Sequence, residues 1–209
     1  MRRYGDAGGF TLIELLVAIA ILALLSALAL PAITAARRSG MRKACKAQIE
    51  RLAAAAQSYE AAFGDYPPTA LAALGFERTN GINEGIESLV RCVTTTRGGG
   101  PFYEPDEDEL GNTDGDETQQ DPTASVLGRP ELLEVLDPWG RPLVYFHHRD
   151  YRGGRRIERY LFDETEQRLR PRPSPETGVY PAPVSFVIWS VGPDGVDQGG
   201  GGDDIASWR

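Results

Sequence analysis

The sequence predicts an α+β fold, in which one long N-terminal helix packs on a small antiparallel sheet. A nearly unbroken helical pattern runs through residues 10–63. Strand-like apolar runs follow at residues 142–146, 157–162 and 184–190. The remainder is rich in turn formers, with 24 Gly and 15 Pro in 209 residues. About three antiparallel strands laid against the helix are the simplest assembly that buries these apolar faces.

The first element is the apolar stretch from Phe10 to Leu30, in which Glu14 is the only charged residue. At about 1.5 Å per residue it forms a helix of roughly 30 Å, the thickness of a bilayer's hydrocarbon core. A carboxylate at mid-membrane costs roughly 2.5–3.5 kcal/mol, so we expect Glu14 to have a partner. A secretory signal peptide is disfavoured because its apolar region is shorter and precedes its cleavage site. A plain signal anchor fits the length but gives Glu14 no role.

The sequence G-F-T-L-I-E from Gly9 to Glu14 resembles the N-terminal methylation motif of type IV pilins and of the pseudopilins of type II secretion. The resemblance implies that a prepilin peptidase cleaves between Gly9 and Phe10 and methylates the new N-terminus at Phe10. Residues 1–9 are then a leader peptide, and the mature chain has 200 residues. It also implies that the Phe10 amino group of one subunit pairs with Glu14 of its neighbour during assembly.

Two signals for membrane orientation oppose each other. Five basic residues follow the span, Arg37, Arg38, Arg42, Lys43 and Lys46, against Arg2 and Arg3 before it. The positive-inside rule alone would place the C-terminal side in the cytoplasm. The resemblance implies the reverse, because the peptidase of that family acts on a cytoplasmic leader. We therefore expect a single-pass inner-membrane protein, spanning at residues 10–30, with its C-terminal domain in the periplasm.

The helix is expected to continue beyond the membrane as an amphipathic half, residues 31–64, with a kink or loosening at Pro31. Good helix formers dominate this half. Apolar or small residues recur at steps of three and four and give one face for packing: Ile49, Leu52, Ala53, Ala56, Tyr59 and Phe63. The sequence from Gly64 to Pro68 ends the helix. Residues 65–209 then form a globular domain, in which residues 85–90 are expected to be a small helix.

Composition limits the function and indicates an insertion. The net charge of −8 argues against nucleic acid as the main partner. Residues 97–128 are expected to be a surface insertion, because the part from 98 to 128 holds nine acids and no base. Within it, Asn112 to Asp121 resembles part of an EF-hand calcium loop, but Leu110 would stand at the first ligand position. A solvated acidic loop is therefore the favoured interpretation.

The sequence Asp137-Pro138-Trp139-Gly140 predicts a turn directly before a strand. Proline fixes φ, glycine allows a positive φ, and Trp139 offers a large apolar surface to the core. A D-P-W-G turn before the first strand is also typical of the major pseudopilin of type II secretion, so this second resemblance narrows the family.

The C-terminus has a third resemblance to the major pseudopilins. The sequence S-V-G-P-D-G from Ser190 leads over a glycine bridge to D-D-I and Trp208, and in that family such a loop wraps a calcium ion. The resemblance implies a calcium site built from the side chains of Asp194, Asp203 and Asp204 and the carbonyl of Val191. Carboxylate and carbonyl oxygens are the ligands that calcium prefers. The bridge is about two residues longer than the usual family version, and Asp197 is a further acid within it.

Two cysteines, Cys45 and Cys92, have no metal-ligand spacing, and unpaired thiols are favoured over a disulfide between them. The adjacent His147 and His148 would point to opposite faces of a strand and receive no role. No catalytic constellation is recognisable in the sequence, so we expect a protein that is not an enzyme.

Together these resemblances imply a structural subunit of the type II secretion pseudopilus. Its expected partners are further copies of itself in a helical filament, minor pseudopilins, the prepilin peptidase, an inner-membrane assembly platform with its ATPase, and membrane lipid. The expected cofactor is calcium, and nucleic acid is not an expected partner. Two rivals stay open: a type IV pilin for adhesion or motility, and a competence pilin that binds DNA through Arg149, Arg152, Arg155, Arg156 and Arg159. A membrane-anchored enzyme is the least favoured alternative.

Overall fold

The computed structural model describes residues 9–76, 78–118, 124–151 and 156–209. It divides into two compact units, Met1–Gly40 and Met41–Arg209, which are described separately. The helices are α1 (Leu12–Phe63), η1 (Leu71–Leu74), α2 (Glu84–Val93), η2 (Glu107–Glu109) and α3 (His148–Tyr151). The strands are β1 (Leu110–Gly111), β2 (Glu134–Val135), β3 (Val144–His147), β4 (Glu158–Phe162), β5 (Thr165–Leu169), β6 (Phe186–Ser190) and β7 (Ile205–Ala206). This α+β architecture, a long N-terminal helix with small antiparallel sheets, is the one that the sequence predicts.

The first unit contains the apolar half of α1. Its described large apolar side chains, from Phe10 to Ile33, are between 49% and 81% exposed. Among the described elements, α1 alone is long and apolar enough to cross a membrane. The helix continues without interruption through Pro31, whose carbonyl accepts a hydrogen bond from the Thr34 hydroxyl. An apolar rod with no covering protein suits a lipid environment.

The remaining half of α1 contributes one face to the core of the second unit. Cys45, Ile49, Leu52 and Ala56 are fully buried there and belong to the same apolar cluster as the sheet residue Trp189. The helix ends at Phe63, and Gly64 follows with a φ of 82°, a left-handed conformation that glycine adopts without strain. The predicted helix end is confirmed, and most of the predicted packing face is buried or partly buried, but Phe63 of that face is 44% exposed.

The main sheet has three antiparallel strands in the order β3-β6-β7. Tyr145 of β3 lies opposite Ile188 of β6, and Trp189 of β6 lies opposite Ala206 of β7. All residues of β3 and β6 are buried, in keeping with their continuous apolar sequences.

The pairing of strand β4 differs from the one expected from the sequence. Strand β4, which includes most of the predicted run 157–162, does not join the main sheet but forms a hairpin with β5. The turn residues Asp163 and Glu164 have φ values of 45° and 66°, which fit a tight two-residue hairpin. Strand β5 is mostly exposed and polar, so no apolar alternation indicated it. A third small sheet pairs β1 with β2.

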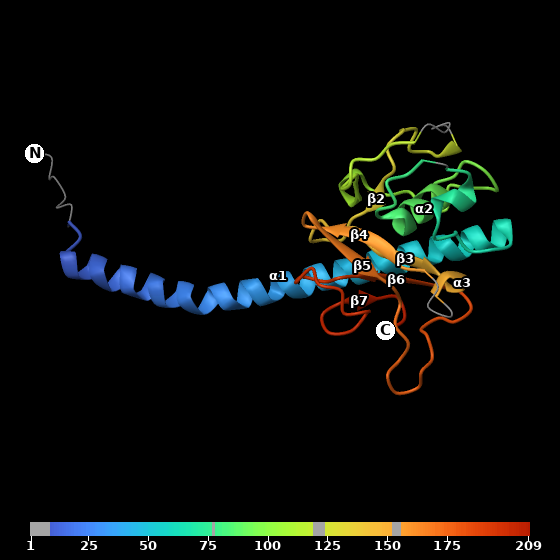
Figure 1. The fold of residues 1–209 in the computed structure, drawn as a ribbon. Coiled ribbons are helices and arrows are strands. Elements are labelled where there is room, and N and C mark those ends of the chain that lie inside the picture. The colour runs from blue at the N-terminus through green and yellow to red at the C-terminus, as the bar shows by residue number, and fades with distance from the viewer. Residues whose placement is uncertain (1–8, 77, 119–123, 152–155) are drawn as a thin grey trace, which may run out of the picture. The chain divides into compact units, whose positions relative to one another are not determined.

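Helix α2 extends the predicted helix at 85–90 and packs closely on the strands. A Cβ atom at Gly85 would lie 2.3 Å from the Tyr145 carbonyl oxygen and 2.6 Å from the Tyr160 hydroxyl oxygen, so only glycine permits this approach. Within the second unit, α2 and β2 lie on one side of α1, and the C-terminal loop lies on the other (Figure 1).

Candidate functional site

The motif at the N-terminus forms a capping box at the start of α1. The carboxylate of Glu14 accepts hydrogen bonds from the Thr11 backbone N–H at 2.9 Å and from the Thr11 hydroxyl at 2.8 Å. In return, the Glu14 N–H donates to the Thr11 hydroxyl at 3.3 Å. This reciprocal arrangement satisfies orphan donors of the first helical turn.

The residues on both sides of the predicted cleavage bond are open to approach. Gly9 and Phe10 precede α1 and are exposed, with Phe10 at 81%. Leader residues 1–8 lie outside the described part of the chain. Glu14 is also exposed, so its carboxylate is free to exchange the local Thr11 partner for one on another molecule.

The turn at Asp137 and the C-terminal loop, which the sequence marks as separate motifs, are joined in the structure. One Asp137 carboxylate oxygen accepts the backbone N–H groups of Trp139 and Arg141, at 2.9 and 3.1 Å. The other accepts the Ser190 hydroxyl at 2.5 Å, and that hydroxyl accepts the Gly192 N–H at 3.0 Å. Burial raises the pKa of Asp137, while these donors stabilise its charged form. The turn therefore fixes the base of the loop.

Two of the predicted calcium ligands converge on one point. The side-chain amide of Gln198 donates to Asp194 at 3.0 Å and to Asp203 at 3.1 Å. Its carbonyl oxygen accepts the Asp203 backbone N–H at 3.1 Å. The Gln198 amide therefore supplies hydrogen-bond donors to both carboxylates. Val191, which begins this loop, is buried.

Asp204 is the third predicted carboxylate. One of its oxygens accepts the N–H groups of Gln198 and Gly200, at 3.0 and 2.8 Å, while the other is buried without a hydrogen-bond partner. Burial raises the pKa of Asp204 to about 6. A free carboxylate oxygen is a ligand type that suits calcium. Asp194, Asp203 and Asp204 are not gathered within 4.8 Å of one another, so calcium binding would have to draw them together.

Asp197 has a structural role. It accepts a hydrogen bond from the Trp189 indole at 3.1 Å and pairs with Arg172 at 3.3 Å. Trp208 packs edge-on against Trp189, with the ring centroids 5.9 Å apart.

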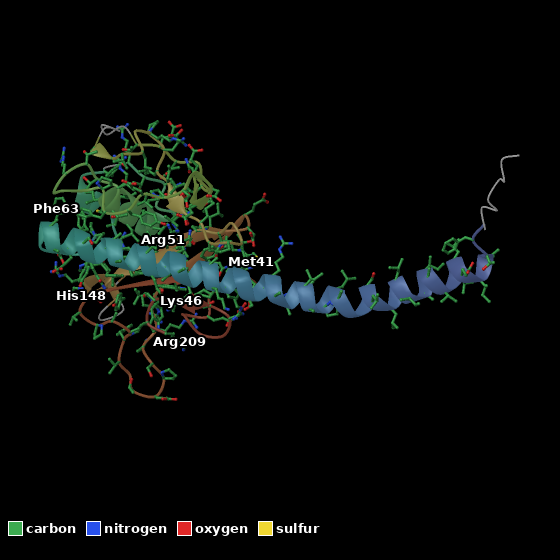
Figure 2. All side chains as sticks on the ribbon, turned by 180° about the vertical axis from the view of Figure 1, so that it is seen from behind. Met41, Lys46, Arg51, Phe63, His148 and Arg209 are labelled. Atoms are coloured by element: carbon green, nitrogen blue, oxygen red, sulfur yellow. The ribbon has the colours of Figure 1, made fainter. Side chains whose placement is uncertain are left out.

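The last residues are tied to α1. The Lys46 ammonium donates to the carbonyls of Ala206 and Arg209 at 2.8 and 2.5 Å, and Figure 2 shows Lys46 and Arg209 on the same side of the helix. Lys46, one of the basic residues that follow the apolar span, thus holds residues 206–209 against α1.

The acidic insertion departs from the expected solvated loop. Asp121, its proposed last EF-hand ligand, lies outside the described residues. Asp114 and Asp116 are partly buried and gather with Glu87 of α2. Glu87 was not predicted as a site residue, although an acid within the apolar helical segment 85–90 was a signal for it.

The arginines considered for DNA binding are engaged with acids where the structure describes them. Arg149 pairs with Asp65 at 2.7 Å, Arg156 pairs with Glu84 and Glu158, and Arg159 pairs with Glu166 at 3.5 Å. Arg152 and Arg155 lie outside the described residues. These pairings reduce the positive field that the described arginines offer to phosphates.

Within the described residues, the two cysteines form no disulfide and each histidine has a polar partner. Cys45 and Cys92 are buried free thiols, and burial raises the pKa of each to about 12. The His147 Nε2 atom lies 3.2 Å from an Asp65 oxygen, and His148 contacts the Ser185 carbonyl at 2.8 Å.

Comparison with known proteins supports the N-terminal part of this description. Residues 6–30 match the family model described as the prokaryotic N-terminal methylation motif. No curated protein and no solved structure matches the chain. The chain thus carries a type IV prepilin-like signal, which indicates a membrane-anchored, pilin-like structural protein.

Proposed function

We propose that this protein is a subunit of the type II secretion pseudopilus, most similar to the major pseudopilin. The observation that carries the proposal is the exposed apolar half of α1 with its methylation motif and its single acid, Glu14. The joined D-P-W-G turn and C-terminal loop support the pseudopilin over a type IV pilin. The minor or specialised subunit is the alternative within the system.

The mechanism is mechanical. After the peptidase removes residues 1–9, the Phe10 amino group is free to pair with Glu14 of a neighbouring subunit. Neutralising a carboxylate in lipid removes the large cost of burying it, so subunit addition and charge pairing become one event. Residues 10–30 form the filament core, and the platform protein and its ATPase drive growth. The rising filament pushes folded proteins toward the outer membrane.

Calcium has a structural part in this proposal. Asp194, Asp203 and Asp204, with the Val191 carbonyl, would hold the ion and lock the C-terminal loop outside the cytoplasm. The bound ion would offset the repulsion among these acids. No catalytic step is proposed for any residue of the chain.

The test is secretion in a strain that lacks this chain. We expect folded type II substrates to accumulate in the periplasm, and the wild-type chain to restore their export. Glu14→Ala should insert in the membrane and be processed, yet give no filaments and no export. Thr11→Ala is the matched control, because it removes the local partner of Glu14 and keeps the carboxylate.

Two results would reject the proposal. Normal export without the chain, with loss of surface pili or of DNA uptake instead, would favour the pilin alternatives. Full restoration by Glu14→Ala would remove the proposed charge pairing.

A further inference from the structure

A second group of acids lies where α2 meets the acidic insertion. Glu87 of α2 and Asp114 and Asp116 of the insertion each place a carboxylate oxygen within 4.8 Å of the others. Among the described residues this is the one such group of three acidic, His or Cys side chains. It is separate from the C-terminal loop and from the methylation motif.

Glu87 is a buried acid without a hydrogen-bond partner. Its side chain is 0% exposed, and neither carboxylate oxygen accepts a hydrogen bond. Both oxygens of Asp114 are likewise buried and unpartnered. A buried carboxylate without a donor, a counter-charge or a proton is very costly, so such groups are normally paired or bound to metal.

The neighbouring acid Glu134 has the hydrogen-bond donors that Glu87 and Asp114 lack. Glu134 of β2 accepts the Asn83 amide at 2.8 Å, the Thr113 backbone N–H at 3.0 Å and the Thr113 hydroxyl at 3.1 Å. The fold therefore supplies donors to Glu134 and leaves the oxygens of Glu87 and Asp114 without any.

The insertion is held in a fixed turn at this point. The Asn112 side chain accepts the N–H groups of Gly115 and Asp116, at 2.8 and 3.2 Å, and donates to the Asp116 carbonyl at 2.8 Å. Gly115 has a φ of 77° in the middle of the turn. These bonds, together with the Thr113 clamp on Glu134, present Asp114 and Asp116 to α2 as a preformed pair.

Basic residues do not neutralise the group. Within the described ranges, no Lys, Arg or His forms an ion pair with Glu87, Asp114 or Asp116, and the nearby Arg156 is paired with Glu84 and Glu158. Three acids packed together without a basic partner repel one another, and a cation between them would relieve this repulsion.

We propose that Glu87, Asp114 and Asp116 bind a calcium ion that fastens the acidic insertion to α2. All the donors are oxygens, which selects a hard divalent cation over a thiolate- or imidazole-preferring metal. Three carboxylates supply between three and six oxygens, and water completes a shell of about 6–8 ligands. This site goes beyond the proposed function and does not depend on it.

The test counts the calcium bound by the full-length chain in detergent, after chelator treatment and dialysis against calcium. Glu87→Gln keeps the shape of the side chain and removes its charge, so we expect the variant to lose one bound ion per chain. Asp114→Asn should lose the same ion from the other side of the contact. Glu107→Gln, an exposed acid of the same insertion, is the matched control and should keep the wild-type count.

The outcomes separate this site from the C-terminal loop. Asp203→Asn with Asp204→Asn reports on that loop alone and should leave the Glu87 ion in place. The proposal is overturned if Glu87→Gln and Asp114→Asn both keep the wild-type calcium count, or if the wild-type chain binds no calcium that these two changes remove. Should one variant fail to fold, the other decides, because the two changes lie on different elements.

Discussion

At the scale of single residues, Asp137 joins two segments of the globular unit. It closes its own turn through two backbone N–H groups and holds Ser190, the first residue of the C-terminal motif. It is 4% exposed, so its removal would leave buried donors without an acceptor.

Asp137→Ala is therefore expected to lower the free energy of unfolding by about 1–3 kcal/mol, the cost of leaving buried polar groups unsatisfied. Denaturant unfolding of the full-length chain, followed by tryptophan fluorescence, measures it. Glu166→Ala is the control, because Glu166 is an exposed partner of Arg159 and such pairs contribute roughly 0–1 kcal/mol. Equal losses in the two variants would contradict the role given to Asp137.

The sequence indicated some of these residues and not others. Glu14 and Asp137 stand in short motifs whose chemistry is local, so spacing alone points to them. Gln198 and Glu87 could not be predicted in the same way. Their surroundings come from segments that meet only after folding, within the glycine bridge and across α2 and the insertion.

At the scale of elements, the helices were easier to predict than the pairing of strands. The 3.6-residue period of α1 is a property of the local sequence, and the predicted end at Gly64 is confirmed. Strand partners depend on long-range contacts, and β5 and β7 are too polar or too short to show a pattern. The pairing of β4 was therefore wrong although its position was right.

The contact between His147 and Asp65 is expected to make the stability of the fold depend on pH. His147, at the end of β3, is 4% exposed, and its Nε2 atom faces Asp65, just beyond the end of α1. Its Nδ1 atom accepts the Arg149 N–H at 3.1 Å, which leaves Nε2 as the donor. Burial lowers the pKa of His147, although Asp65 opposes this shift. Burial alone would raise the pKa of Asp65, but the hydrogen bond and charge of His147 and the charge of Arg149 hold it below its usual value.

The direction of the pH effect follows. A histidine with a lowered pKa binds fewer protons folded than unfolded, so its contribution to stability is lost as the pH falls through its unfolded value of about 6.5. We expect the wild-type chain to lose more stability between pH 8 and pH 5 than His147→Asn does. Thermal unfolding at several pH values measures this. His148→Asn should reduce the sensitivity less than His147→Asn does, because the charge of His148 contributes only part of the lowered pKa of His147. Identical pH profiles for wild type and His147→Asn would contradict the assignment.

At the scale of the whole molecule, the two units differ in where their apolar side chains lie. The first unit exposes them along a helix that carries one acid, and the second unit buries most of them in a core. Under the proposed function, such a division would suit a chain that is held in lipid as a monomer and assembles through its apolar half. The charge of Glu14, which would obstruct burial of that half, would then be neutralised by the Phe10 amino group of a neighbouring subunit.

The most direct test of this account is the mass of the N-terminus of the chain isolated from cells that contain an active prepilin peptidase. We predict a chain of 200 residues that begins with a methylated Phe10, after loss of the nine leader residues. An intact Met1 in such cells would contradict it, because Glu14 would then have no neighbouring amino group to pair with.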